Sequence, residues 1–201
     1  SGFGLFTESI SGESDLLLRP GSGTLDASIL RELRQRSGEL PVDYFPVLEL
    51  SGAKAGDEET DLLRFVGVDL VAIGNAIGQS GEANGAPLIR PDEKEPSPLG
   101  ATDACLVGEA FARARGVEKG SRLRVWIQDR SADLRIAGIL PDPANRPAIP
   151  ENLLLMDLPA LQQASGEVHR ISRIEIRFPG EGSSRMEVTR RLAAFSQSRG
   201  L

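Results

Sequence analysis

The sequence predicts an α+β protein in which a discontinuous α/β subdomain, built from both ends of the chain, carries an inserted β-rich subdomain. Two observations lead to this prediction. Both ends of the chain read as strands followed by helices, whereas the middle contains the clearest alternation of apolar and polar residues, which is the pattern of a half-buried strand. The insertion of one subdomain into another is the most economical explanation of this difference.

The N-terminal segments read as a β-α-β unit. The apolar run in residues 14–20 is closed by proline and glycine, which predicts a strand and a turn. Residues 24–38 place leucine and isoleucine near helical spacing, with Thr24 or Asp26 as the N-cap and a glycine as the stop. Residues 42–50 predict a second strand, and the proline within it indicates a sheet edge or a bulge.

The middle of the chain begins with a strand predicted for residues 61–70. Residues 71–100 are rich in glycine and proline, so we expect mainly irregular structure there, with a short helix near residues 71–77. Residues 103–116 predict a short strand and a short helix that ends at a glycine.

Residues 121–140 carry the strongest β pattern and predict a hairpin. Its turn is expected near Asp129 to Ala132. In the first strand, inward-facing Leu123, Val125 and Ile127 alternate with outward-facing Arg122, Arg124 and Trp126.

The C-terminal segments repeat the order of strand and helix. Residues 153–157 predict a fully apolar strand, and residues 158–166 a helix ended by glycine. In the strand predicted for residues 170–178, the isoleucines face inward and Arg173, Glu175 and Arg177 face solvent. A final helix is predicted from a capping box of Ser184 and Glu187, with an apolar stripe made of Val188, Leu192 and Phe195.

Composition narrows the class of protein. The chain has 201 residues, 40% of them hydrophobic and 26% charged, which is typical of a soluble folded protein. Its net charge of -6 argues against nucleic acid as a partner, because binding to phosphates needs clustered cations. No run approaches the roughly 18 consecutive apolar residues of a membrane helix.

Few residues are suited to catalysis. His169 is the only histidine, so a serine or cysteine triad and most zinc sites would all have to use it, and a solvated loop position is the simpler interpretation. Cys105 is the only cysteine, so the chain forms no internal disulfide, and its apolar neighbours predict a buried thiol. Gly21 to Gly23 match no phosphate-binding motif and predict a tight turn with a positive φ angle.

Carboxylates gather in two places that could in principle serve a hydrolase. They match no calcium-binding loop, and the low aromatic content of 4% offers little surface for stacking a sugar. Solvated loops are the simpler interpretation of both groups. The residues are Asp57, Glu58, Glu59 and Asp61 in the first group, and Asp92, Glu93 and Glu95 in the second.

Asp157 and Trp126 each allow two interpretations. Asp157 ends an apolar strand, where α/β enzymes often place a catalytic group, but it also directly precedes a helix with proline in its first turn, which favours an N-cap. Trp126, the only tryptophan, lies near Arg124 and could contact a partner protein, since exposed aromatic residues beside arginine mark interface anchors. Packing of Trp126 beneath residues 71–100 is the alternative.

The order of the segments resembles the extracytoplasmic domain of MacB-like and FtsX-like ABC transporter permeases. The resemblance covers nearly the whole chain and is diffuse. Its motifs, in order, are GVD at Gly67, a GxxxA helix at Gly108, a KG turn before the hairpin, and MDL before the helix that follows Asp157.

The resemblance implies a domain between the first and second transmembrane helices of a permease subunit, at the extracytoplasmic or periplasmic face of a bacterial inner membrane, which would explain the abrupt chain ends. A membrane-proximal α/β subdomain would comprise residues 1–52 and 168–201, and the inserted β-rich subdomain residues 53–167. The implied partners are a cytoplasmic ATP-binding subunit, a second permease subunit in a homo- or heterodimer, and a periplasmic protein or hydrophobic substrate.

The resulting hypothesis is a non-catalytic domain that couples ATP-driven motion of membrane helices to events outside the membrane. It carries no cofactor, metal or catalytic residue of its own, and Trp126 and Arg124 are its candidate partner contacts. Two alternatives stay open: a free periplasmic binding or adaptor protein, and a small hydrolase that uses the carboxylate groups described above.

Overall fold

The computed structural model describes residues 14–37, 42–56, 61–71, 101–142, 148–178 and 183–199. These residues form a mixed α+β fold with a large sheet and four helices. The chain divides into two compact units. The smaller unit consists of Glu13–Val47 and His169–Leu201, and the larger unit includes Leu48–Val168.

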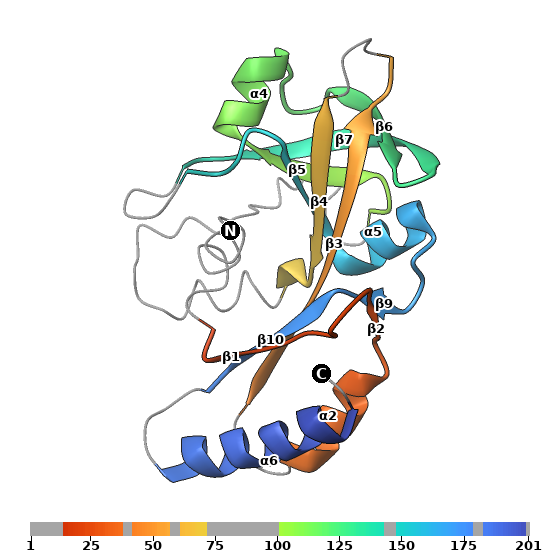
Figure 1. The fold of residues 1–201 in the computed structure, drawn as a ribbon. Coiled ribbons are helices and arrows are strands. Elements are labelled where there is room, and N and C mark those ends of the chain that lie inside the picture. Colours follow the sequence, from red (N-terminus) through yellow and green to blue (C-terminus); the bar gives the residue numbers. More distant parts are fainter. Residues whose placement is uncertain are drawn as a thin grey trace. The chain divides into compact units, whose positions relative to one another are not determined.

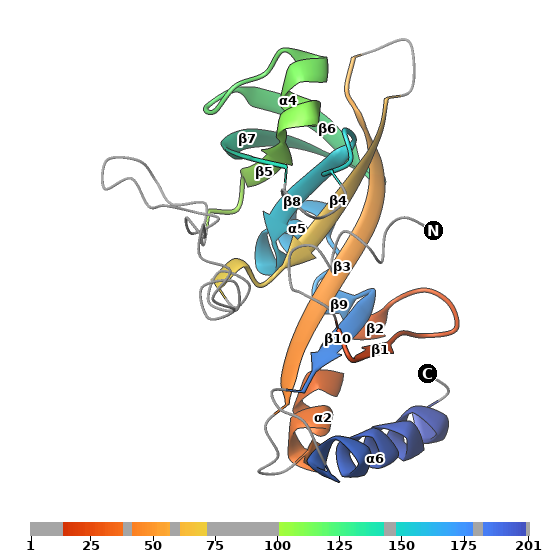
Figure 2. The same cartoon turned by 90° about the vertical axis from the view of Figure 1, so that its left-hand side faces the viewer.

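The larger unit is built around a closed barrel of strands (Figures 1 and 2). Each strand is hydrogen-bonded to the next in the order β3, β4, β8, β5, β7, β6, and β6 also pairs with β3, which closes the ring. Closure leaves the barrel without a free edge strand. The bounds are β3 Asp43–Lys54, of which this unit contains the part from Leu48, β4 Leu62–Val68, β5 Ala104–Gly108, β6 Arg122–Ile127, β7 Arg130–Leu140 and β8 Leu153–Asp157.

Every second side chain along the strands points into the barrel, and these side chains form its core. In β6, the predicted inward residues Leu123, Val125 and Ile127 are buried and the residues between them are exposed. The predicted apolar strand is β8, which is buried on both of its faces. The shared core consists of Leu48, Leu50, Leu63, Phe65, Cys105, Val107, Leu123, Val125, Ile127, Leu134, Ile136, Leu154 and Met156 from the strands, with residues from two helices.

Those two helices lie at opposite ends of the barrel (Figures 1 and 2). Helix α4 (Glu109–Arg115) contributes Phe111 and Ala112 to the core, and α5 (Leu158–Ser165) contributes Ala160 and Leu161. Each helix ends at a glycine in the left-handed conformation, Gly116 at φ 59° and Gly166 at φ 79°, as the sequence predicts.

The smaller unit combines short antiparallel strands with two helices. β10 (Arg173–Arg177) lies between β1 (Leu16–Leu18) and the first part of β3, and β2 (Leu25–Asp26) pairs with β9 (Arg170–Ile171). The helices are α2 (Ile29–Ser37) and α6 (Ser183–Arg199), which contact each other. The predicted stripe of α6 is buried, with Val188, Leu192 and Phe195 between 1% and 4% exposed.

The start of α2 differs from the prediction. The helix begins at Ile29 rather than near Leu25, because Leu25 and Asp26 pair with β9. Asp26 still stabilises the start of the helix, since its Oδ1 accepts a hydrogen bond of 2.8 Å from the Ser28 amide. Hydrogen bonding from Ser28, first from its side chain and then from its amide, lowers the pKa of Asp26.

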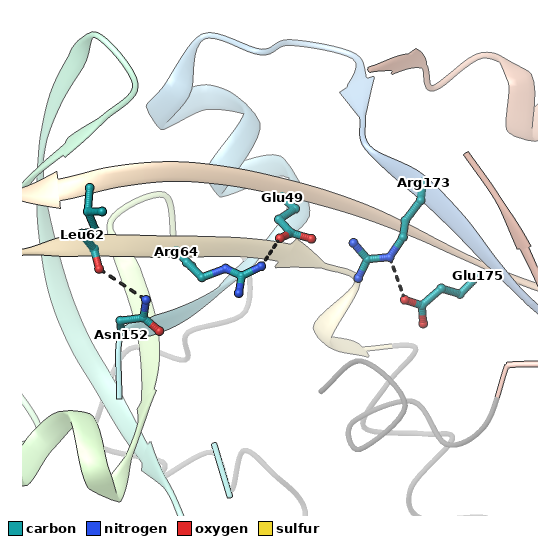
Figure 3. A network of polar contacts seen from close by, with 6 residues as sticks. All are labelled: Glu49, Leu62, Arg64, Asn152, Arg173 and Glu175. Carbon is teal, nitrogen blue, oxygen red and sulfur yellow. Dashed lines mark hydrogen bonds and ion pairs between the residues drawn. The ribbon is translucent and has the colours of Figure 1, made fainter. Parts of the chain in front are cut away.

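One side-chain prediction for the smaller unit is wrong. Glu175 is only 3% exposed rather than solvated, and the Arg173 guanidinium lies 3.0 Å from its carboxylate (Figure 3). A buried carboxylate requires such a partner, because desolvation of an isolated charge is strongly unfavourable. Glu187 binds Arg190 and Arg191 further along α6, and the side chain of Ser184, its partner in the predicted capping box, lies outside the described residues.

Candidate functional site

The outer surface of the barrel carries a row of apolar side chains across neighbouring strands. Trp126 of β6 pairs with Ala53 of β3. In the hairpin of β3 and β4, the Lys54 amide donates a hydrogen bond to the Asp61 carbonyl. In this register, Ala53 of β3 lies directly opposite Leu62 of β4. Directly opposed residues of antiparallel strands project from the same face, so Leu62, Ala53 and Trp126 share the outside of the barrel.

This apolar row, defined as Leu62, Ala53 and Trp126, has an exposed large side chain at each end and the partly buried Ala53 between them. Trp126 is 46% and Leu62 is 65% exposed. The neighbours of the indole are small, because Trp126 faces Ser131 on its other side, in β7. The two large side chains lie two strands apart, about 10 Å, and the small side chain of Ala53 lies between them.

Charged side chains border the apolar row on β6 and β7. Arg124 lies two residues before Trp126 on the same face, and its guanidinium makes two bonds to the Asp133 carboxylate, of 2.8 and 3.1 Å. This hydrogen-bonded pair lowers the pKa of Asp133 and raises that of Arg124. Both side chains are well exposed, so the pair orients Arg124 more than it stabilises the fold.

A second ion pair lies on the other side of the row, on β3 and β4 (Figure 3). Arg64 Nη2 is 2.7 Å from Glu49 Oε1, and the Arg64 amide donates to the Asn152 carbonyl at 2.8 Å. Asn152 in turn donates from Nδ2 to the Leu62 carbonyl at 3.4 Å. These contacts fix the backbone of β4 at Leu62.

Gly52 permits the close approach of β3 and β6 that brings the row together. A Cβ atom on Gly52 would meet the Trp126 carbonyl oxygen and would lie 2.7 Å from the Phe65 ring. Only glycine therefore fits between this ring and the backbone of β6.

Trp126 and Arg124, the candidate contacts predicted from the sequence, thus lie on one exposed face. Leu62 was missed. Its signal is the adjacent pair Leu62 and Leu63, because neighbouring strand residues project from opposite faces and only one of the two can enter the core.

Asp157 occupies the predicted N-cap position of α5, but it makes no side-chain capping bond to the helix. One usual donor is missing because Pro159 has no amide hydrogen. The carboxylate Oδ1 instead accepts a bond of 3.4 Å from the Leu70 amide. Burial raises the pKa of Asp157, opposed by that amide and reinforced by the charge of Asp69.

The other residues considered in the sequence, His169, Cys105 and Gly23, have positions that a structural role explains. His169 is exposed and has φ 61°, in the turn before β9. Cys105 is 1% exposed in the barrel core, and burial raises the pKa of its thiol to about 12, so the nucleophilic thiolate is suppressed. Gly23, with φ 71°, lies in the predicted tight turn.

Most residues of the two acidic groups predicted from the sequence lie outside the described part of the chain. Asp57, Glu58 and Glu59 and the whole second group, Asp92, Glu93 and Glu95, lie outside the described residues, as does most of the helix predicted near residues 71–77. Asp61 is held by Arg115, with bonds of 2.8 and 2.6 Å. Among the described residues, no three acidic, histidine or cysteine side chains cluster as metal ligands.

None of the helices in the described part of the chain combines the length and apolar character needed to cross a membrane. No protein-family model matches the sequence. No curated protein matches it either.

Solved structures with this fold include two extracytoplasmic domains of transporters. The periplasmic region of MacB from Actinobacillus actinomycetemcomitans aligns with a TM-score of 0.55 at 11% identity, covering 92% of this chain and 83% of that one. The extracellular domain of the noncanonic ABC-type transporter YknZ from Gram-positive bacteria aligns with a TM-score of 0.52 at 13% identity, covering 92% and 93%. The fold expected from the order of the sequence segments is therefore confirmed.

Proposed function

We propose that this chain is a non-catalytic extracytoplasmic domain of an ABC transporter permease subunit. It lies between the first and second transmembrane helices and couples their ATP-driven motion to a partner or substrate outside the membrane. The observation that carries the proposal is the shared fold, which extends over 92% of the chain in both solved domains. The proposed partners are a cytoplasmic ATP-binding subunit and a second permease subunit in a bacterial inner membrane.

We further propose that the apolar row is the surface through which the domain contacts a protein partner. An exposed tryptophan and an exposed leucine about 10 Å apart can enclose one apolar side chain of a partner. Arg124 beside them can add a charge-assisted hydrogen bond, because Asp133 already holds its guanidinium in place.

Photocrosslinking in the intact transporter tests this assignment. A photoreactive phenylalanine analogue at Trp126 is expected to crosslink to a protein of the same complex. The matched control position is Ala114, which is exposed on α4 of the same barrel. Equal crosslinking from both positions, or none from position 126, would contradict the assignment of the apolar row.

The two other functions make different predictions. A free periplasmic adaptor lacks a hydrophobic segment of about 20 residues on each side of this domain in the complete reading frame. Finding such segments on both sides supports the permease assignment, and their absence contradicts it. A hydrolase would lose its activity on substitution of the two acidic groups, whereas a coupling domain has none to lose.

A further inference from the structure

Charge is distributed unevenly along the chain. Residues 13–47 and 169–201, which form the smaller unit, carry 11 arginines and 9 acidic residues, a net charge of +2. The other residues carry 12 basic and 20 acidic side chains, a net charge of -8, which together give the total of -6. Such asymmetry between the parts of one chain indicates that they meet different surroundings.

The excess of positive charge is concentrated in the helical layer, which we define as α2 and α6. Together the two helices contain seven arginines and two glutamates. The arginines are Arg31, Arg34, Arg36, Arg185, Arg190, Arg191 and Arg199.

Both glutamates are already paired with arginines of the same layer. Glu32 binds Arg199, and Glu187 binds Arg190 and Arg191 at 2.7 and 2.8 Å. Hydrogen bonding to Arg191, together with Arg190, lowers the pKa of Glu187, so it stays ionised. The internal pairs therefore use both negative charges and leave an excess of positive charge on the layer.

The arginines of the layer whose side chains the structure describes are exposed to solvent. Arg31 and Arg34 lie three residues apart, and both are exposed, so they share one side of α2. Arg36 is held over the Phe195 ring at 5.1 Å, but it is exposed as well. On α6, Arg190 is exposed one turn after Met186, an apolar side chain that is 76% exposed.

We propose that the helical layer of the smaller unit docks on the anionic lipid headgroups of the membrane surface. One guanidinium group can bind two phosphate oxygens at once. An exposed methionine can enter the boundary between the headgroups and the acyl chains. The acidic remainder of the chain is repelled by the same surface. This inference rests on the proposed function, which places the domain at a membrane.

A second copy of the chain could also present negative charge to this layer. The bilayer is favoured because both helices carry exposed arginines and α6 adds an exposed apolar side chain, which is the arrangement of surface-bound helices. Self-association is therefore treated as a competing outcome.

Co-sedimentation of the 201-residue chain with vesicles tests the proposal. We expect binding to vesicles of equal parts phosphatidylcholine and phosphatidylglycerol at low salt, with little binding to phosphatidylcholine alone and a loss of binding at high salt. Since each cation at an anionic surface strengthens partitioning about fivefold, the double variant Arg31→Glu/Arg34→Glu should bind at least about tenfold more weakly.

The matched control is Arg113→Glu/Arg122→Glu, which changes the net charge equally at exposed positions of the larger unit. It should bind like the unchanged chain, and thermal melts should show that both variants fold. Equal loss of binding in the control, or no binding to anionic vesicles, overturns the proposal. Self-association without vesicles that only the helix variant loses also overturns it, in favour of a second copy.

Failure of this test leaves the permease assignment standing. That assignment depends on the flanking hydrophobic segments and on crosslinking in the intact transporter, which do not require the helical layer to bind lipid.

Discussion

Asp157 shows at the scale of a single residue how a polar side chain joins two strands of the barrel. β4 and β8 run parallel, with Val68 beside Asp157. The carboxylate therefore reaches the Leu70 amide just beyond the end of β4, where it accepts a hydrogen bond. This bond connects the ends of two strands that are far apart in sequence, which is a structural role.

Two substitutions of Asp157 distinguish the effect of its charge on stability from the effect of its hydrogen bond. Because burial raises the pKa of Asp157, folding favours the protonated form. The contribution of this group to stability is therefore greatest in acid and falls as pH rises from the ordinary pKa of aspartate through the raised value. Asp157→Asn removes this dependence and keeps an oxygen acceptor, so its stability relative to the unchanged protein should increase over that pH range.

Asp157→Ala removes the acceptor as well as the charge. Loss of the partner of the Leu70 amide should make this variant about 1 kcal/mol less stable than Asp157→Asn. Urea denaturation of the three proteins at several pH values measures both effects. Equal stability of the two variants would show that the hydrogen bond contributes nothing, and an unchanged pH slope in Asp157→Asn would show that burial does not govern the titration.

At the scale of elements, closure of the barrel depends on the contact between β3 and β6. Their pairing covers only Gly52 to Lys54, opposite Val125 to Ile127. Gly52 lies at the tightest point of this short contact, against the backbone of Trp126 and the ring of Phe65. The apolar row depends on the same contact, because Ala53 lies between its two large side chains.

Gly52→Ala should therefore destabilise the protein by about 1–3 kcal/mol, because the added methyl group meets backbone rather than the end of a flexible side chain. Gly21→Ala is the matched control. A Cβ at Gly21 meets nothing within 4 Å, so the change should stay within about 0.5 kcal/mol. Urea midpoints at constant m-value measure the difference, and equal midpoints would show that β3 moves away from β6 without penalty.

At the scale of the whole molecule, the proposed role of the apolar row can be tested separately from folding. Trp126 and Leu62 project from the outside of the barrel, so shortening both should change stability little. We expect Trp126→Ala/Leu62→Ala to lower transport by the intact permease at least about tenfold, as for loss of a central interface anchor. The measurement is transport per correctly inserted complex, with a thermal melt of the isolated domain.

Leu17→Ala in β1 is the control for an exposed leucine elsewhere in the chain, since that side chain is 51% exposed. It should leave transport unchanged. Normal transport by the double variant, or an equal loss in the control, would argue against the apolar row as a specific contact.

Prediction from the sequence was most accurate where a pattern is local. The alternation in β6 assigned Trp126 and Arg124 to the outer face, and glycines marked the ends of α4 and α5. It was less accurate where a distant segment intervenes. The hairpin turn is Gln128 and Asp129, one residue earlier than predicted, and a register shift opposite Cys105 and Leu106 ends the regular alternation of β7 at Ala137.

The sequence by itself determined the order of the elements, the inward and outward faces of most strands, and the resemblance to a permease domain. The tertiary structure alone decided that the barrel closes through Gly52, that Leu62 joins Trp126, and that Glu175 is buried beside Arg173. The physical reason is that periodicity fixes which side chains share a face of one strand. Strand partners are chosen by long-range pairing, for which a single sequence carries no local signal.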